Sequence, residues 1–253
     1  MMVAEETRRR ARATSREARG KVAALGYAFA YDAIVSGYAP FETLADLIGT
    51  RLAAEIGRDG RVLDVSCGTG ILARRLAAHG LSVTGVDPVA TVARRRAPAS
   101  MTARLSFDAA DIAREPIAGA LFDALVSMHT LGWHPDRRAL LAGCRASLRS
   151  GAPAIFVAAT RPPAIVPALR RLTAREGLAA ALRALRWLVP TALFERVRDT
   201  ALYYPSQDEL AATLEAAGFD VLECVPTFVA DLSLLVRARR RRSDSIHGRE
   251  ERL

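Results

Sequence analysis

The stretch Val62–Gly70 reads VLDVSCGTG, and this stretch decides the fold class of the chain. An apolar run that contains Asp64 is followed by a glycine-rich turn and then by apolar residues at helical spacing. This order predicts a buried strand, a tight loop and the N-terminus of a helix. Such a loop brings bare backbone N–H groups next to a ligand. We therefore expect a ligand site where the strand ends.

Strand-like and helix-like segments alternate on both sides of that loop. The alternation runs to residue 159, and two amphipathic helices precede it. It predicts an α/β fold of the doubly wound, Rossmann-like type, with helices on both faces of a parallel sheet. The expected strands are Arg61–Val65, Leu81–Val86, Ala103–Phe107, Phe122–Ser127 and Pro153–Ala159, and the expected helices are Tyr27–Gly37, Phe41–Ile56, Thr69–Ala78, Ala90–Arg96 and Asp136–Leu148.

The alternation breaks after the fifth strand. Residues 161–200 carry no clear strand, and prolines separate helical pieces that are rich in leucine and alanine. A helical insertion at this point would form a lid over the carboxyl edge of the sheet. Ser206, with Glu209 three residues later, predicts a capping box at the start of a helix that stops at Gly218. Two β-like runs, Phe219–Val225 and Phe228–Ala238, then close the fold as an antiparallel edge pair.

The net charge of +9 is concentrated at the two ends of the chain. Residues 1–21 hold seven basic and three acidic side chains, and residues 237–253 hold the same numbers, so each end contributes +4. We expect a flexible basic arm over 1–20, one domain over 21–238 with a helical cap over 161–205, and a basic disordered tail over 239–253. The tail is expected to be solvated, and weak contact with anionic lipid or nucleic acid is the alternative.

Cysteine usage and hydropathy indicate the compartment. The three cysteines are widely spaced and form no CxxC pair, which is typical of reduced thiols in a cytoplasmic protein. No apolar run approaches the roughly 18 residues that a membrane span needs. We therefore expect a cytoplasmic location and no membrane span.

Acidic residues stand at or just after the ends of successive expected strands and indicate a nucleotide-like cofactor. In open α/β sheets, ligands bind beyond the carboxyl ends of the strands. Asp64 suits a cationic amine and suits a pyrophosphate poorly, whereas Asp87 can accept hydrogen bonds from both hydroxyls of a ribose. The spacing Gly68-x-Gly70-x-x-Ala73 also fits a dinucleotide-binding turn. These residues alone leave two cofactors open. One is a dinucleotide, which carries a pyrophosphate, and the other is a nucleotide-like cofactor that carries a cationic amine.

The segment after the third expected strand favours the cofactor that carries a cationic amine. Asp111 would accept a hydrogen bond from the exocyclic amine of an adenine, and Ile112 would cover the ring. Ten residues later the chain reads LFDALVS, and further segments follow a common pattern. These segments are YDAIVSGY (31–38), VLDVSCGTG (62–70), VTGVDPV (83–89), DAADI (108–112), LFDALVSMHTLGWHPD (121–136), LRSGAPAIF (148–156) and YPSQDELAATLEAAGF (204–219).

Together these segments resemble the small-molecule class I S-adenosylmethionine (SAM) methyltransferases, in the group that includes the ubiquinone and menaquinone C-methyltransferases. The resemblance runs from about Tyr27 to Val236. It implies a seven-stranded sheet of order 3-2-1-4-5-7-6 with SAM at its carboxyl edge. Ser66 departs from the pattern, because many members have a glycine there, and Ala152 replaces a second glycine before the fifth strand. The lid matches no particular substrate class.

The resemblance also implies a role for each matching residue. Asp64, Gly68 and Gly70 would hold the methionine end of SAM. Asp87 would hold the ribose, and Asp111 with Ile112 the adenine. The expected cofactor set is completed by Tyr31, Tyr38, Ser66, Pro88 and Ser127.

His129, just past the fourth strand, is the candidate general base. Methyl transfer needs alignment of donor and acceptor, exclusion of water and removal of one proton. The ordinary pKa of histidine, about 6.5, suits removal of a proton from a phenol, enol or alcohol. A histidine that is only packed at the strand end is the alternative. The residues expected to touch substrate are Met128, His129, Trp187, Tyr203 and Tyr204. The histidines show no metal spacing, so no metal site is expected.

The predicted function is SAM-dependent O- or C-methylation of a small, hydrophobic metabolite in secondary metabolism. A nucleic-acid methyltransferase is an alternative, although residues 127–130 read SMHT rather than the [DN]PP[YF] of amino-methylases. An NAD-dependent oxidoreductase is another, and Asp64 argues against it. A SAM-fold enzyme without methyl transfer, such as a cyclase, is a third. No nucleic-acid partner is expected, and the sequence leaves a homodimer open.

Overall fold

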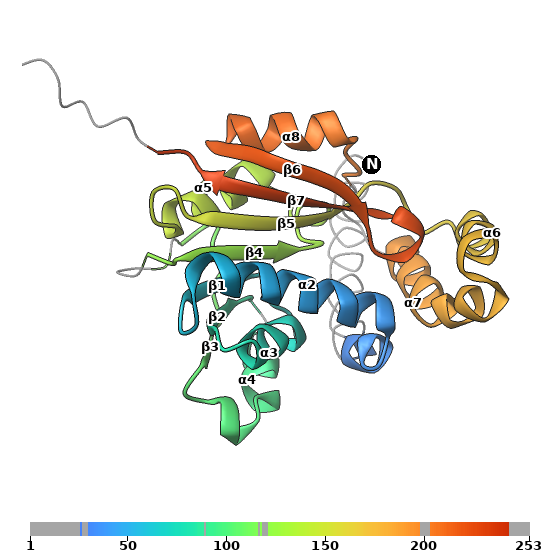
Figure 1. The fold of residues 1–253 in the computed structure, drawn as a ribbon, viewed down its shortest axis with the longest axis horizontal. Coiled ribbons are helices and arrows are strands. Elements are labelled where there is room, and N and C mark those ends of the chain that lie inside the picture. The colour runs from blue at the N-terminus through green and yellow to red at the C-terminus, as the bar shows by residue number, and fades with distance from the viewer. Residues whose placement is uncertain are drawn as a thin grey trace, which may run out of the picture.

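The computed structural model describes residues 26, 30–88, 90–115, 117, 121–197 and 203–242 of the 253-residue chain. Its centre is a seven-stranded sheet of order β3-β2-β1-β4-β5-β7-β6, which confirms the predicted topology (Figure 1). The first five strands are parallel, and β7 lies antiparallel between β5 and β6. The strands are β1 Arg61–Val65, β2 Ser82–Val86, β3 Leu105–Asp108, β4 Ala124–Met128, β5 Pro153–Ala159, β6 Phe219–Thr227 and β7 Ser233–Arg240.

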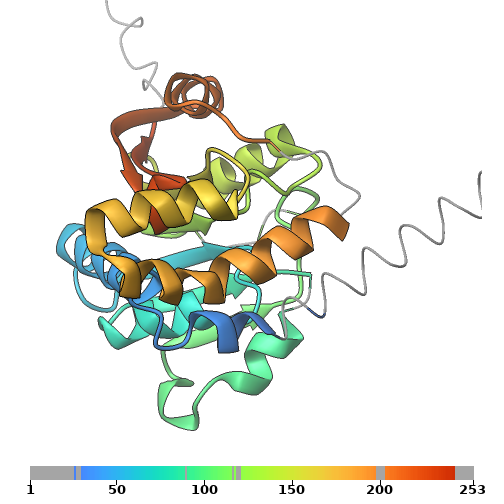
Figure 2. The same ribbon diagram turned by 90° about the vertical axis from the view of Figure 1, so that its right-hand side faces the viewer.

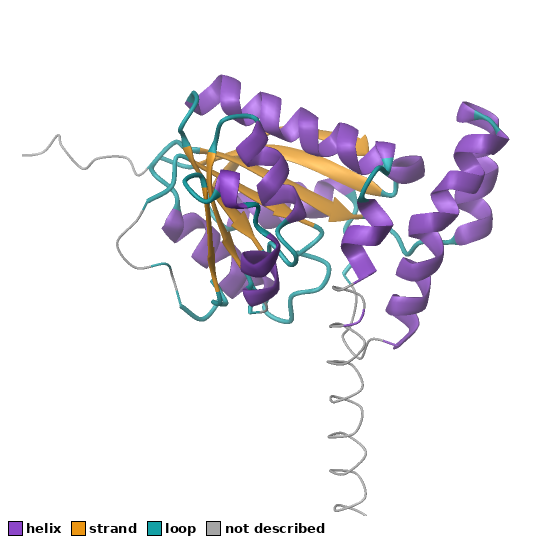
Figure 3. Cartoon of the chain, turned by 90° about the horizontal axis from the view of Figure 1, so that it is seen from below, coloured by secondary structure: helices purple, strands orange, loops and turns teal. Residues whose placement is uncertain are grey.

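Helices cover both faces of the sheet, as Figure 3 shows. Successive strand residues point to opposite faces, so β1 sends Val62 into one core and Leu63 into the other. The first core lies under α2 Ala39–Ile56, α3 Ile71–Ala78 and α4 Thr91–Arg96. The second lies under α5 Arg137–Ser147 and α8 Gln207–Ala216. The central strands β1, β4 and β5 are therefore buried on both faces, which explains their continuous apolar runs.

The segment after β5 is helical, as predicted. It forms α6 Ile165–Glu176 and α7 Leu178–Val197, which pack against each other. Figure 2 shows the two helices crossing one end of the molecule, beyond the carboxyl ends of the parallel strands. The predicted capping box is also present, since Ser206 accepts from the backbone of Glu209 and the Glu209 side chain accepts from the backbone of Ser206.

Two predicted boundaries differ most from the structure, and the other described boundaries shift by no more than about two residues. The run Phe228–Ala238 is not one strand, because residues 228–232 form a tight turn and β7 begins only at Ser233. The expected tail from residue 239 is also partly ordered, because β7 continues to Arg240. Arg239 donates to Glu55 at 3.0 Å and Arg241 donates to Asp220 at 2.8 Å, and these ion pairs fix the strand end. The predicted arm over 1–20 lies outside the described residues, and so do residues 243–253.

Residues 30–35 are helical and agree with the later part of the helix expected over Tyr27–Gly37. In the part of the chain that the structure describes, no helix is long and apolar enough to cross a membrane.

Candidate functional site

The loop after β1 has the geometry of a ligand-binding turn. Ser66, Gly68 and Gly70 have φ values of 58°, 53° and 75°. A Cβ at Gly70 would lie 2.8 Å from the ring of Phe107 and 2.9 Å from Ala93, so the loop packs down closely on the sheet. A Cβ at Gly68 would meet no described atom within 4 Å. Packing against Phe107 and Ala93 thus fixes the loop backbone at Gly70, whereas the loop is open at Gly68.

Asp64 lies beneath this loop and is only 2% exposed. Its carboxylate accepts a hydrogen bond from the backbone N–H of Ala73, but its Oδ2 has no hydrogen-bond partner among the described residues. Burial, together with the nearby charge of Asp87, raises the pKa of Asp64 to about 8. A buried carboxylate oxygen without a donor is costly. The site therefore fits a ligand that brings a cationic or hydrogen-bonding group to Asp64.

Asp87 and Asp111 lie beyond the neighbouring strands. Asp87 accepts from the backbone N–H of Gly68 at 3.1 Å, which joins the tip of β2 to the loop. Asp111 accepts from the backbone of Ala113 at 3.0 Å, and its Oδ1 lies 3.4 Å from His134 Nε2. Asp64 thus lies near the end of β1, and Asp87 and Asp111 follow β2 and β3, which are the next strands in the sheet.

Gly143 and His134 lie near Ile112 and Asp111, and neither was predicted as a site residue. Ile112 is buried, and a Cβ at Gly143 of α5 would collide with its carbonyl group. Glycine at 143 therefore lets the segment after β3 lie against α5. His134 Nδ1 also lies 2.7 Å from the carbonyl oxygen of Asp136 and 3.1 Å from its backbone nitrogen, and this turn leads into the N-cap of α5. No pattern in the sequence links these positions to residue 111.

The helix over residues 30–35 is fastened to the loop through Asp32. Thr69 Oγ1 donates to Asp32, and Arg74 and Arg96 form ion pairs with its Oδ2 at 3.0 and 2.8 Å. Arg74 also donates to the carbonyl of Thr69 at 2.8 Å. This network brings α3 and α4 together with the N-terminal helix at the loop. Asp32 was not predicted as a site residue, because its partners lie 37 or more residues away in the chain.

His129 directly follows β4 and has a left-handed conformation, with φ of 58°. Its backbone N–H donates to Val157 at 2.7 Å, and its Nε2 lies 3.0 Å from Ser233 Oγ. Burial lowers the pKa of His129 to about 4, so the ring is neutral near pH 7. Ser233 was not predicted as a site residue, because the predicted strand Phe228–Ala238 gave that position no special role.

Four rings meet at the same edge of the sheet, and we call them the aromatic cluster: Tyr38, His129, Trp187 and Phe228. Phe228 is its centre, with ring centroids 5.0 Å from Trp187, 5.3 Å from His129 and 6.5 Å from Tyr38. Phe228 has φ of 66° and ψ of −161°, a region that is almost restricted to glycine. The cluster joins the lid, the N-terminal part of the chain and the β6–β7 turn.

Polar groups without partners accompany the aromatic cluster. The hydroxyl of Tyr38 is buried, and no described residue hydrogen-bonds to it. Burial raises the pKa of Tyr38 above its ordinary value of 10.0, so the side chain is a neutral phenol near pH 7. Ser127 Oγ on β4 is likewise buried with no partner in the described part of the chain. Met128, half-buried, separates Ser127 from His129.

The remaining predicted residues are less central. Tyr31 packs edge-on against Phe41, with centroids 6.4 Å apart. Tyr203 packs under the Arg137 guanidinium at 4.3 Å, and its hydroxyl lies 3.2 Å from Thr213 Oγ1 on α8. These contacts hold the Tyr203 side chain against α5 and α8. Pro88 is exposed just after Asp87, and Tyr204 is half-buried.

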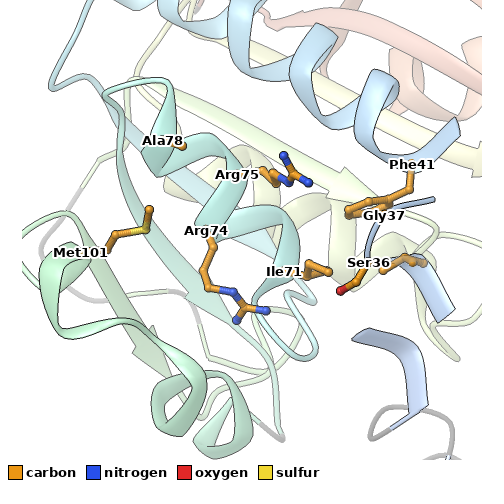
Figure 4. A pocket seen from close by; sticks show the side chains of 9 residues that line it. Ser36, Gly37, Phe41, Ile71, Arg74, Arg75, Ala78 and Met101 are labelled. Atoms are coloured by element: carbon orange, nitrogen blue, oxygen red, sulfur yellow. The ribbon is translucent and has the colours of Figure 1, made fainter. Parts of the chain in front are cut away.

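A separate pocket of about 360 Å³ opens between α3 and the start of α2 (Figure 4). Its lining includes none of the predicted site residues. Two arginines line it, but Arg74 pairs with Asp32 and Arg75 with Glu42. Neither guanidinium is thus free to bind an anion there. Among the described residues, no cluster of His, Cys, Asp and Glu side chains could hold a metal ion.

This fold and loop define a class of protein. Residues 37–224 match the family model described as a methyltransferase domain, which covers more than half of the chain. The chain belongs to this methyltransferase domain family.

Curated relatives agree with this membership over shorter stretches. An O-methyltransferase of Pyrenophora dematioidea is 37% identical over 95 residues, which are 36% of this chain and 36% of the relative. A ubiquinone biosynthesis O-methyltransferase of Chromobacterium violaceum is 32% identical over 94 residues, or 36% of this chain and 40% of the relative. The chain thus spans about two fifths of the length of the curated relatives that it matches.

Solved structures share the fold. Magnesium protoporphyrin IX methyltransferase from Synechocystis PCC 6803, with bound S-adenosylhomocysteine, aligns with a TM-score of 0.57 at 18% identity, over 80% of this chain and 84% of that one. The [4+2]-cyclase SpnF aligns with a TM-score of 0.54 at 17% identity, over 78% and 81%. At such identities the likeness concerns the fold alone.

Proposed function

We propose that this protein is a SAM-dependent methyltransferase that acts on a small, hydrophobic molecule. The observation that carries the proposal is the buried Asp64, whose Oδ2 has no donor from the described residues beneath an open glycine loop. The amino group of a methionine moiety would supply the missing donor and positive charge. Membership of the methyltransferase domain family supports the same conclusion.

Each part of the cofactor has residues suited to hold it. Asp64 and the backbone of Gly68 and Gly70 would hold the methionine end, with Ser66 and Ser127 at its sides. Asp87 would accept from the ribose hydroxyls, next to Pro88, while Asp111 and Ile112 would hold the adenine. Tyr31 and Tyr38 would close the site from the N-terminal side. Bound SAM supplies a methyl group that its sulfonium already activates.

The acceptor would lie against the aromatic cluster. Its rings offer apolar, planar surfaces to a hydrophobic acceptor, and the buried hydroxyls of Tyr38 and Ser127 would orient it. His129 is neutral near pH 7 and so is able to accept a proton. With a pKa of about 4 it is a weak base, which favours an acidic acceptor such as a phenol or an enol. O-methylation suits these acceptors, and the names of both curated relatives record it for those proteins.

Calorimetric titration with S-adenosylhomocysteine tests the cofactor proposal. We expect wild-type protein to bind with a dissociation constant of roughly 1–100 μM, and the Asp87→Ala variant to bind at least about tenfold more weakly. Asp220→Ala is the matched control, because Asp220 is an exposed carboxylate that pairs with Arg241 at the sheet edge. A flat wild-type titration would rule out the proposal.

Methyl transfer itself needs a second assay. Incubation with SAM and candidate phenols should release S-adenosylhomocysteine in proportion to methylated product. If the protein binds the cofactor and converts the acceptor into a product without an added methyl group, the result would instead indicate non-methylating chemistry. We expect no change in NADH fluorescence when NADH is titrated with the protein. Saturable binding of NADH would favour an oxidoreductase.

A further inference from the structure

Helix α7 is apolar on two opposite faces. Its inner face is buried against the protein through Ala184, Trp187 and Leu188. Helix α7 crosses the front of the molecule in Figure 2, and its outer face is the one directed toward the viewer. Four large apolar side chains on this helix remain exposed: Leu178 at 63%, Leu182 at 56%, Val189 at 37% and Leu193 at 57%.

This concentration of apolar residues is unusual. The described chain has eight exposed large apolar side chains in all, and α7 alone carries four of them. Spacings of four, seven and four residues place these four on one stripe, with half-buried Leu185 between them. A helix that is apolar all round normally has both faces covered. The stripe on α7 therefore indicates a surface that is buried in another state of the molecule.

The stripe is symmetric about its own centre. Leu178 lies as far before the midpoint between Leu185 and Arg186 as Leu193 lies after it, and Leu182 and Val189 are related in the same way. Two copies of α7 related by a two-fold axis run antiparallel, and in that arrangement each residue faces its mirror position. Leucine at 178 would then face leucine at 193 of the second copy. A two-fold interface requires such self-complementarity.

The charged residue at the midpoint is turned aside. Arg186 donates to the backbone carbonyls of Ala33 and Ser36, the latter at 2.7 Å. Its guanidinium is therefore held against the N-terminal helix of its own chain. Two arginines near a two-fold axis would otherwise repel each other. The hydrogen bonds to Ala33 and Ser36 thus already occupy the charged side chain that would otherwise oppose pairing.

We propose that a second copy of this chain docks on the α7 stripe as an antiparallel, two-fold helix pair. The N-terminal arm is a poorer occupant, because residues 3–20 lack apolar periodicity. A membrane surface would also bury apolar residues, but it places no symmetry requirement on their order. The mirror arrangement of the stripe favours a second copy.

The pairing would act on the lid. The inner face of α7 carries Trp187, whose ring contacts Phe228 of the aromatic cluster. A dimer would hold α7 from its outer side and so hold the cluster closed. This consequence rests on the proposed function, whereas the pairing itself does not.

Sedimentation velocity of the full chain tests the pairing without any activity measurement. Between roughly 1 and 100 μM, we expect wild-type protein to shift from monomer to dimer. Leu182→Glu should raise the dissociation constant at least about tenfold, because it buries a charge from each copy. Leu222→Glu is the matched control, since Leu222 is 50% exposed on β6 and lies off the stripe. Circular dichroism checks that both variants fold.

Disulfide trapping tests the antiparallel register. Position 182 of one copy would face position 189 of the other, so the double variant Leu182→Cys with Val189→Cys should form disulfide-linked dimers under diamide. The single variants should not, because equivalent positions would lie seven residues apart along the helix pair, about 10 Å, which exceeds disulfide reach. Cross-linking by the single variants would overturn the antiparallel arrangement.

Other outcomes overturn the proposal. A wild-type monomer at 100 μM, in the range where pairing is expected, would contradict it. A monomer that sediments with anionic phosphatidylglycerol vesicles, and loses this on Leu182→Glu, would assign the stripe to membranes instead. A dimer unaffected by Leu182→Glu would place the interface elsewhere. Failure of cofactor binding, in contrast, would leave the pairing result intact.

Discussion

His129 Nε2 lies 3.0 Å from Ser233 Oγ, and this contact spans from the end of β4 to the start of β7. The two residues are 104 positions apart in the chain, and β5 lies between their strands in the sheet. With Nε2 engaged by Ser233, Nδ1 is the ring nitrogen left for an acceptor. Ser233 is therefore expected to set both the orientation and the tautomer of His129.

Replacement of Ser233 by alanine tests this positioning role. We expect kcat to fall about tenfold with little change in KM, and Ser233→Thr to restore most of the activity. The unfolding free energy should fall by about 1–3 kcal/mol, because His129 loses its partner. Ser147→Ala is the control, since Ser147 is also buried and donates to Gly143 at 3.0 Å within α5. If both variants keep full activity and the same pH profile, Ser233 has no positioning role.

His129 should make the protein less stable in mild acid. Its pKa is lowered from 6.5 to about 4 in the folded state, so the unfolded state binds a proton first as the pH falls. The fold therefore loses stability between pH 6.5 and about 4, by an amount on the order of 3 kcal/mol. Urea unfolding at several pH values should show a steeper loss for wild type than for His129→Gln. Parallel curves for the two proteins would contradict the lowered pKa.

Asp64 should destabilise the free protein. Its pKa is raised from 3.8 to about 8, so its contribution is most favourable below pH 3.8 and is lost as the pH rises through 8. Asp64→Asn removes the buried charge, and we expect it to stabilise the protein by about 1–3 kcal/mol at pH 8. The same change should weaken S-adenosylhomocysteine binding at least about tenfold. Thermal unfolding with and without ligand measures both effects, and a destabilised variant would count against the burial argument.

Phe228 offers a test of backbone strain. Its φ of 66° and ψ of −161° suit glycine and are costly for any other residue. Phe228→Gly should therefore be more stable than Phe228→Ala by about 1–2 kcal/mol, the reverse of the usual order. Both variants should lose activity, because both remove the ring at the centre of the aromatic cluster. A more stable alanine variant in urea unfolding would show that the turn is not strained.

Local rules predicted those parts of the molecule that depend on neighbours in sequence. The VLDVSCGTG loop and the capping box at Ser206 follow from residue types within a few positions of each other. The strand order came from a family resemblance and not from spacing. The turn at Phe228 was not predicted, because its β-like composition is overridden by ring contacts with Trp187 and His129. Ser233 was missed in the same way, since its partner lies on another strand.

The ion pairs of Asp32 affect the electrostatics of the loop after β1. Asp32 neutralises part of the charge of Arg74 and Arg96, both of which lie on helices that flank the loop. Deletion of the segment before Ala39 would leave these two guanidinium groups without that carboxylate. The potential around the loop would become more positive and would repel a sulfonium-bearing ligand more than its neutral thioether product. The N-terminal helix would therefore influence the preference for substrate over product through Asp32, the residue that fastens it to the loop.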